Sequence, residues 1–201
     1  MPRYPDAERE KAQLETRRKL LEAATKEFAE KGFDKANVDR ISQAAGFAKG
    51  TIYNYFENKR AIMLALIEEF SSAHVAYLTE EVHQEVNADR RMERFFKAGF
   101  DFVVQHLAQG RVVVNNLYGS DEEFKLAMYH AYAPMFALVG EEILALGISQ
   151  GLFRQFDPAS TAGIVMNIYL GVSWQIDRNG TTMITHEQVA DFILNGLRVK
   201  V

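Results

Sequence analysis

The sequence contains no cysteine among its 201 residues, and it has only 4 prolines. The absence of cysteine excludes disulfides, thiolate nucleophiles, cysteine-ligated zinc and iron–sulfur clusters. It also favours a reducing compartment. Charged residues are frequent among the first ten, where a signal peptide needs an apolar segment. We therefore expect a cytoplasmic protein.

Long uncharged segments are also scarce, and the longest covers residues 158–176, between Asp157 and Asp177. Its length is close to that of a membrane span. However, it contains Ser, Thr, Asn and Gln side chains and lacks long runs of Leu or Ile. We expect it to form a buried helix of a bundle, and we expect no membrane partner.

Basic residues are in excess only near the N-terminus. Residues 1–60 carry 13 Lys/Arg and 10 Asp/Glu (+3), and residues 61–201 carry 10 and 17 (−7), which together give the net charge of −4. A basic segment before an acidic remainder is typical of a nucleic-acid-binding module joined to a second domain.

Apolar residues recur at helical spacing almost throughout, so we predict an all-α protein. Leu14, Leu21, Ala24 and Phe28 form one face of a long helix over 6–31, which Gly32 ends. A short helix follows over 37–45 with Asn37 as its N-cap, then a second over 49–56, and Asn58 begins a further helix. We expect longer helices from about residue 75, separated near 87–89, Gly110, 119–121, 151–158 and 178–180.

Residues 32–62 form the most informative segment, GFDKANVDRISQAAGFAKGTIYNYFENKRAI. A helix, a sharp turn at Ala45-Gly46 and a second short helix make a helix-turn-helix, whose second helix fits the DNA major groove. Val38, Ile41 and Ala45 are expected to pack on Ile52 and Phe56. The remaining side chains of the second helix then face outward.

This segment resembles the N-terminal DNA-binding domain of tetracycline-repressor (TetR) family transcriptional regulators. The match includes Gly32-Phe33, Ala45-Gly46 and the run Lys49 to Tyr53, and it departs at Ala48, where relatives commonly have Ser or Thr. The resemblance implies a three-helix DNA-binding domain over 1–60 and a helical-bundle domain for ligand binding and dimerisation over 61–201. The residues expected to bind DNA are Asn37, Lys49, Gly50, Thr51, Tyr53, Asn54, Tyr55 and Lys59.

The resemblance implies a homodimer that binds a palindromic double-stranded DNA operator. It also implies a repressor that a small apolar or amphipathic effector releases from DNA. Large apolar and polar-tipped side chains on successive helices are typical of an effector pocket. The residues expected to line it are Phe96, Phe100, Met128, Tyr132, Met166 and Tyr169.

Two patterns raise the alternative of a helical-bundle enzyme, and a protein-binding adaptor is a further alternative. Gly147 to Gly151 match G-x-S-x-G, but a serine-hydrolase elbow needs a strand before the serine. Glu80 and His83 have the spacing of a di-iron ligand pair, and no second pair exists in the sequence. We therefore expect no catalytic residues, no metal and no cofactor.

Overall fold

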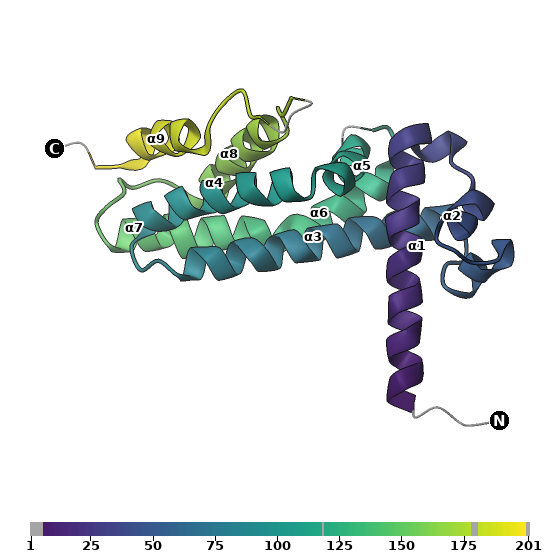
Figure 1. Cartoon of the computed structure of the whole chain (residues 1–201). Coiled ribbons are helices and arrows are strands. Elements are labelled where there is room, and N and C mark those ends of the chain that lie inside the picture. Colours follow the sequence, from purple (N-terminus) through teal and green to yellow (C-terminus); the bar gives the residue numbers. More distant parts are fainter. Residues whose placement is uncertain (1–5, 118, 178–180, 200–201) are drawn as a thin grey trace. The chain divides into compact units, whose positions relative to one another are not determined.

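The computed structural model describes residues 6–117, 119–177 and 181–199, and within these ranges the chain is helical, with two isolated β-bridges and no strand (Figure 1). The all-α prediction is confirmed. The chain divides into two compact units: unit 1 comprises Met1–Glu69 and Ala108–Lys125, and unit 2 comprises Phe70–Leu107 and Leu126–Val201. The three boundaries fall inside helices α3 (Lys59–His83), α5 (Leu107–Leu117) and α6 (Glu122–Ala137).

Unit 1 contains α1 (Asp6–Lys35), α2 (Val38–Ala44), the 3₁₀ helix η1 (Lys49–Asn54) and most of α5 (Leu107–Leu117), with the first turns of α3 and α6. Helix α1 is longer than predicted, but Gly32 inside it adopts φ 73° and ψ 166°, so the predicted break is present. The predicted break at Gly110 is wrong. Helix α5 runs through Gly110, which is buried, and the interruption falls at His106 instead. Packing there outweighs the cost of about 1 kcal/mol that glycine imposes on a helix interior.

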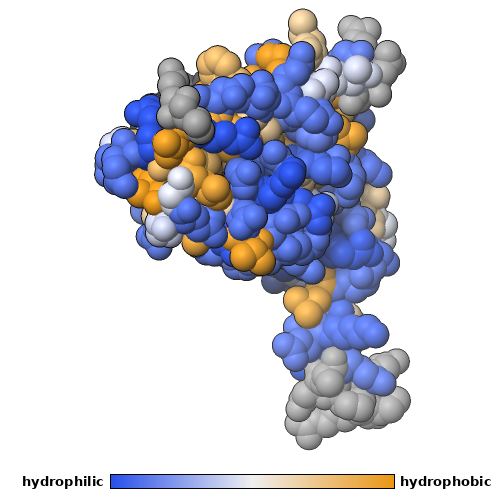
Figure 2. Space-filling model, turned by 90° about the vertical axis from the view of Figure 1, so that its left-hand side faces the viewer, coloured by the Kyte–Doolittle hydropathy of each residue, from blue (hydrophilic) through white to orange (hydrophobic). Residues whose placement is uncertain are grey.

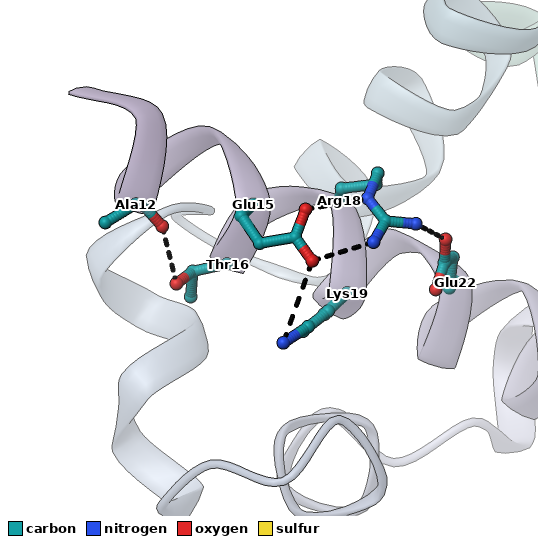
Figure 3. A network of polar contacts seen from close by, with 6 residues as sticks. All are labelled: Ala12, Glu15, Thr16, Arg18, Lys19 and Glu22. Atoms are coloured by element: carbon teal, nitrogen blue, oxygen red, sulfur yellow. Dashed lines mark hydrogen bonds and ion pairs between the residues drawn. The ribbon is translucent and has the colours of Figure 1, made fainter. Parts of the chain in front are cut away.

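The first turns of α1 are held by local contacts rather than by burial. Leu14, predicted to face the core, is 62% exposed. The apolar face of α1 is buried only from Leu20 onward. Arg18 pairs with Glu15 at 2.7 Å and also with Glu22, while Thr16 Oγ1 donates to the Ala12 carbonyl at 2.9 Å (Figure 3). Such exposed pairs contribute little to overall stability, but they support the local helical conformation where the side chains are exposed.

Unit 2 contains the rest of α3 and α6, then α4 (Ala88–Gln105), η2 (Leu138–Ala145), α7 (Leu146–Ser149), α8 (Pro158–Ser173) and α9 (His186–Leu197). Helix α4 packs against α8, α9 and η2. The uncharged stretch forms α8, and its N-cap Asp157 accepts from Ser160 N at 2.8 Å. The predicted break at 178–180 lies outside the described residues.

Helix η2 is a π-helix that continues α6 directly into α7. Its buried residues include Leu138, Val139, Ile143 and Leu144. Pro134, one turn earlier in α6, removes a backbone donor from the helix. The segment packs on α8 and α4, so this irregular turn lies against the core of unit 2.

Within the part of the chain that the structure describes, two helical segments are long and apolar enough to cross a membrane by length and composition alone: Lys59–His83 and Glu122–Ser149. About half of each apolar window, 50% and 44%, is buried inside the protein. Core helices of soluble proteins pass the same test. Helix α8, which contains most of the uncharged segment 158–176, has 16 residues and is not one of these two candidate spans.

Some large apolar side chains of unit 2 remain exposed. Ile164 on α8 is 60% exposed and Phe192 on α9 is 71% exposed. Both line a groove between these helices, together with Val165, Ile168 and Ile193. Figure 2 shows hydrophobic residues reaching the surface in patches on the side of the molecule that it faces. The α8–α9 groove is therefore an apolar surface without a partner among the described residues.

Candidate nucleic-acid interface and effector site

A small apolar core fixes the helix-turn-helix in unit 1. Ile41 of α2 and Ile52 of η1 are fully buried, and Phe56 is 5% exposed. Helix α2 packs on both η1 and α1, where Leu21 and Phe28 are also buried. The predicted packing partners are therefore buried, except that Val38 and Ala45 are half-buried. This core sets the orientation of η1, whose other side chains face solvent.

The turn between α2 and η1 is closed by specific hydrogen bonds. Gly46 adopts φ 86°, a conformation that favours glycine. Ser42, fully buried, donates its Oγ–H to the Ala48 carbonyl at 2.6 Å. Ala48 is the N-cap of η1 and provides no side-chain cap. Ser42 thus supplies a side-chain hydrogen bond to this turn, where Ala48 can supply none.

The outer face of η1 is polar and accessible. Lys49, Gly50 and Asn54 are exposed, Tyr53 is 52% exposed, and Thr51 and Tyr55 are half-buried. At Gly50, an added Cβ would meet nothing within 4 Å, and the residue does not have positive φ. Neither the fold nor the local backbone of unit 1 therefore requires glycine there. A close approach of an external backbone would require it.

Two of the residues expected to bind DNA already have structural roles. Asn37 caps α2, since its side chain accepts from Arg40 N at 3.1 Å. The Lys59 ammonium donates to the carbonyls of Asp34 at 2.8 Å and Ala36 at 3.3 Å, and it lies 5.0 Å from the centre of the Phe33 ring. An ammonium has three N–H groups, so one remains for an external acceptor. Lys59 thus supports the end of α1 as well as its own helix.

All six residues expected to line an effector pocket are buried in unit 2, and the structure brings some of them together. The Phe96 and Tyr169 ring centroids are 6.3 Å apart. Tyr132 and Tyr169 both contact the ring of His74. Phe100 lies elsewhere, 6.2 Å from the His186 ring. Met128 and Met166 are also buried.

His74 joins the two tyrosines and was not singled out as a site residue in the sequence. Its Nδ1 lies 3.1 Å from the Tyr132 hydroxyl, and its Nε2 lies 2.8 Å from the Tyr169 hydroxyl. Its ring stacks on Phe102 at 4.3 Å. Burial lowers the pKa of His74 to about 3, and burial raises the pKa of both phenols. All three groups are therefore uncharged at neutral pH.

The depressed pKa of His74 predicts a loss of stability in mild acid. The unfolded imidazole binds a proton below about pH 6.5, and the folded one does not until about pH 3. Between pH 7 and pH 5, the wild-type free energy of unfolding should fall by about 2 kcal/mol more than that of His74→Gln. Urea denaturation at both pH values measures this. The control is His130→Gln, because His130 is exposed; its free energy of unfolding should fall by as much as that of wild type. A wild-type loss equal to that of His74→Gln would contradict the prediction.

The patterns that suggested an enzyme have structural explanations. Ser149 ends α7, and its Oγ–H donates to the Leu146 carbonyl at 2.7 Å. A Cβ at Gly147 would lie 2.1 Å from the Phe153 ring, and Gly151 turns the chain with φ 69°. The G-x-S-x-G segment is thus a tightly packed helix end, as interpreted from the sequence. Among the described residues, no group of three His, Asp or Glu side chains is placed to hold a metal ion.

Comparison with known proteins matches residues 20–66 to the family described as "Bacterial regulatory proteins, tetR family". The chain is 29% identical over 153 residues to the HTH-type transcriptional repressor KstR2 of Mycobacterium tuberculosis, covering 71% of this chain and 72% of KstR2. Other curated regulators are 32–44% identical, but over only 65–73 residues. This chain matches about a third of the length of those regulators, 35–38%.

Solved structures show the same fold over nearly the whole chain. The fatty acid degradation regulator FadR from Bacillus halodurans has a TM-score of 0.82 at 23% identity, covering 92% of this chain and 97% of FadR. FadR from Bacillus subtilis, solved in complex with stearoyl-CoA, has a TM-score of 0.74 at 20% identity, covering 88% and 95%. The helix-turn-helix and the matched segment agree: residues 20–66 form an N-terminal domain of the tetR family of bacterial regulatory proteins, within a helical architecture that the solved structures share.

Proposed function

We propose that this protein is a sequence-specific, DNA-binding transcriptional regulator that acts as a repressor. The DNA-binding domain covers about residues 1–60, and residues 61–201 form the domain for effector binding and dimerisation. The observation that carries the proposal is the outer face of η1. It is exposed, it offers a lysine, a tyrosine and an asparagine, and it has an unobstructed Gly50. Lysine and tyrosine suit phosphates, and asparagine suits a base edge.

The proposed regulator is a homodimer. Two copies of the α8–α9 groove would bury Ile164 and Phe192 against each other, which a monomer leaves exposed. A two-fold dimer presents two copies of η1. The operator is then a palindrome whose half-sites are about one helical turn, or a multiple of it, apart. A cytoplasmic location follows from this role, since the DNA of a bacterium lies there.

The proposed effector is a small apolar or amphipathic molecule that weakens DNA binding. Support comes from the buried aromatic and Met residues of unit 2. The helix-end role of Ser149 favours a regulator over a serine hydrolase.

Selection of bound sequences from a random DNA pool tests the proposal. We expect a palindromic consensus, bound in the nanomolar range at physiological salt and at least a thousandfold tighter than a shuffled sequence. Fluorescence anisotropy at several salt concentrations should give a linear decrease of log K with log salt. Recovery of no consensus, together with equal binding of the shuffled sequence, would contradict sequence-specific regulation.

A further inference from the structure

A polar cluster lies in the core of unit 2, where four helices meet. Ser71 and His74 come from α3, Tyr132 from α6, and Tyr169 and Ser173 from α8. Helix α4 comes close at Gly99, where an added Cβ would lie 2.6 Å from the Tyr169 hydroxyl. All five polar residues are buried, and Ser71, Tyr169 and Ser173 are fully so. A cluster of this polarity is costly in a core unless its hydrogen bonds are made.

The hydrogen bonds of this cluster are incomplete. His74 uses both ring nitrogens on the two phenols. Ser71 and Ser173 lie beside the phenols of Tyr132 and Tyr169, respectively, and each acts to lower the pKa of its phenol. Yet neither serine Oγ makes a hydrogen bond of normal geometry with the described residues, although both atoms are buried. A buried hydroxyl without such a bond costs about 1–3 kcal/mol, so these two atoms favour a molecule that supplies partners.

The electrostatics of the cluster restrict what that molecule can be. The causes that shift the pKa of His74, Tyr132 and Tyr169 are burial, each other, the two serines and His106, and no lysine or arginine is among them. A carboxylate, sulfonate or phosphate would be buried here without a counter-charge, at a cost of several kcal/mol. Phenol and serine hydroxyls instead offer donors and acceptors to a neutral carbonyl or hydroxyl.

We propose that the cluster of Ser71, His74, Tyr132, Tyr169 and Ser173 holds the polar group of the effector, and that the effector is an uncharged, apolar molecule bearing a carbonyl or hydroxyl group. The apolar body of the effector lies among the aromatic rings around the cluster, which include Phe70, Phe95 and Phe102. This inference rests on the proposed function, since it assigns the chemistry of the effector site.

Two fluorescent naphthalenes of similar size test the proposal. Prodan is an uncharged aminonaphthyl ketone, and dansyl acid is an aminonaphthalene sulfonate. Fluorescence titration of the full-length protein should show saturable, blue-shifted prodan emission and at least about tenfold weaker binding of dansyl acid. Equal affinity for the two probes would overturn the proposal, because the site would not then discriminate against charge.

Single substitutions in the cluster test whether prodan binds there. Tyr132→Phe and Tyr169→Phe should each weaken prodan binding about threefold to tenfold, the effect of one neutral hydrogen bond. Tyr129→Phe is the matched control, since Tyr129 lies on α6 but is 66% exposed. It should not change the affinity. Equal prodan affinity of all three variants and wild type would overturn the assignment of the site.

The serines distinguish a binding role from a structural one. Ser71→Ala and Ser173→Ala remove hydroxyls that make no hydrogen bond of normal geometry with the described residues, so the midpoint of thermal unfolding should stay the same or rise. Prodan affinity should nevertheless fall about threefold or more. A lower unfolding midpoint with unchanged prodan affinity would overturn the proposal. Anisotropy with operator DNA on the same samples reports the proposed function separately, because it does not depend on probe binding.

Discussion

The double variant Lys49→Ala/Tyr53→Ala should bind operator DNA about a thousandfold more weakly than the wild-type protein. Both side chains lie on the exposed face of η1. A dimer loses four contacts, each contributing about 1 kcal/mol, and about 4 kcal/mol is a thousandfold in affinity. The slope of log K against log salt should also become shallower by about two, one for each lysine lost from the dimer. Fluorescence anisotropy over a range of salt concentrations measures both effects.

The matched control is Lys97→Ala/Tyr129→Ala, which removes the same residue types from exposed positions in unit 2. It should bind operator as wild type does. Lys59→Ala is informative in a different way, because it also removes bonds to the Asp34 and Ala36 carbonyls. Only this lysine variant should lower thermal stability. Wild-type operator affinity in Lys49→Ala/Tyr53→Ala would show that η1 does not contact DNA.

The second large effect is expected for Phe192→Glu. Phe192 is 71% exposed in the groove of α8 and α9, so a charge there costs the folded subunit little. In the proposed dimer, two such glutamates would be desolvated and brought close to each other in an apolar contact, which should dissociate the dimer. Light scattering should then give about the 22.8 kDa of one chain. Operator affinity should fall by a factor of about 10²–10⁴, because the two half-sites are no longer bound by one linked molecule.

Val86→Glu provides the control, since Val86 is 78% exposed and does not line the α8–α9 groove. It should leave the molecular mass and the operator affinity unchanged. Circular dichroism melting of both variants separates dissociation from unfolding. A Phe192→Glu protein with the mass of a dimer would place the subunit contact elsewhere.

Local signals in the sequence identified the helix starts and the helix-turn-helix. Asn37, Asn58 and Asp157 each accept a backbone N–H from the first turn of the following helix. N-capping depends on a few neighbouring residues, so it is visible in a sequence. Glycine signals were less consistent. Gly32 and Gly46 adopt positive φ as expected of chain breaks, whereas Gly110 lies inside α5, because tertiary packing decides its conformation.

The candidate sites differ in how far the sequence predicted them. The DNA-binding face lies within one continuous segment, so its residues were found together. The polar cluster in unit 2 combines residues far apart in the sequence, such as His74 and Tyr169, whose hydrogen bond spans 95 positions. Spacing within one helix cannot show such a pair. The only local signal was the position of His74, four residues after Phe70, on the apolar side of its helix.

The π-helical segment η2 changes the register of the helix that contains it. Leu138 and Ile143, like Val139 and Leu144, are buried five positions apart, whereas an α-helix returns to the same face after three or four. The segment therefore acts as an insertion in an otherwise regular helix, and each inserted residue rotates everything downstream by about 100°. Gly147, which must face the Phe153 ring, comes after it. The number of residues in η2, and not only their hydrophobicity, thus determines which side of α7 faces the core.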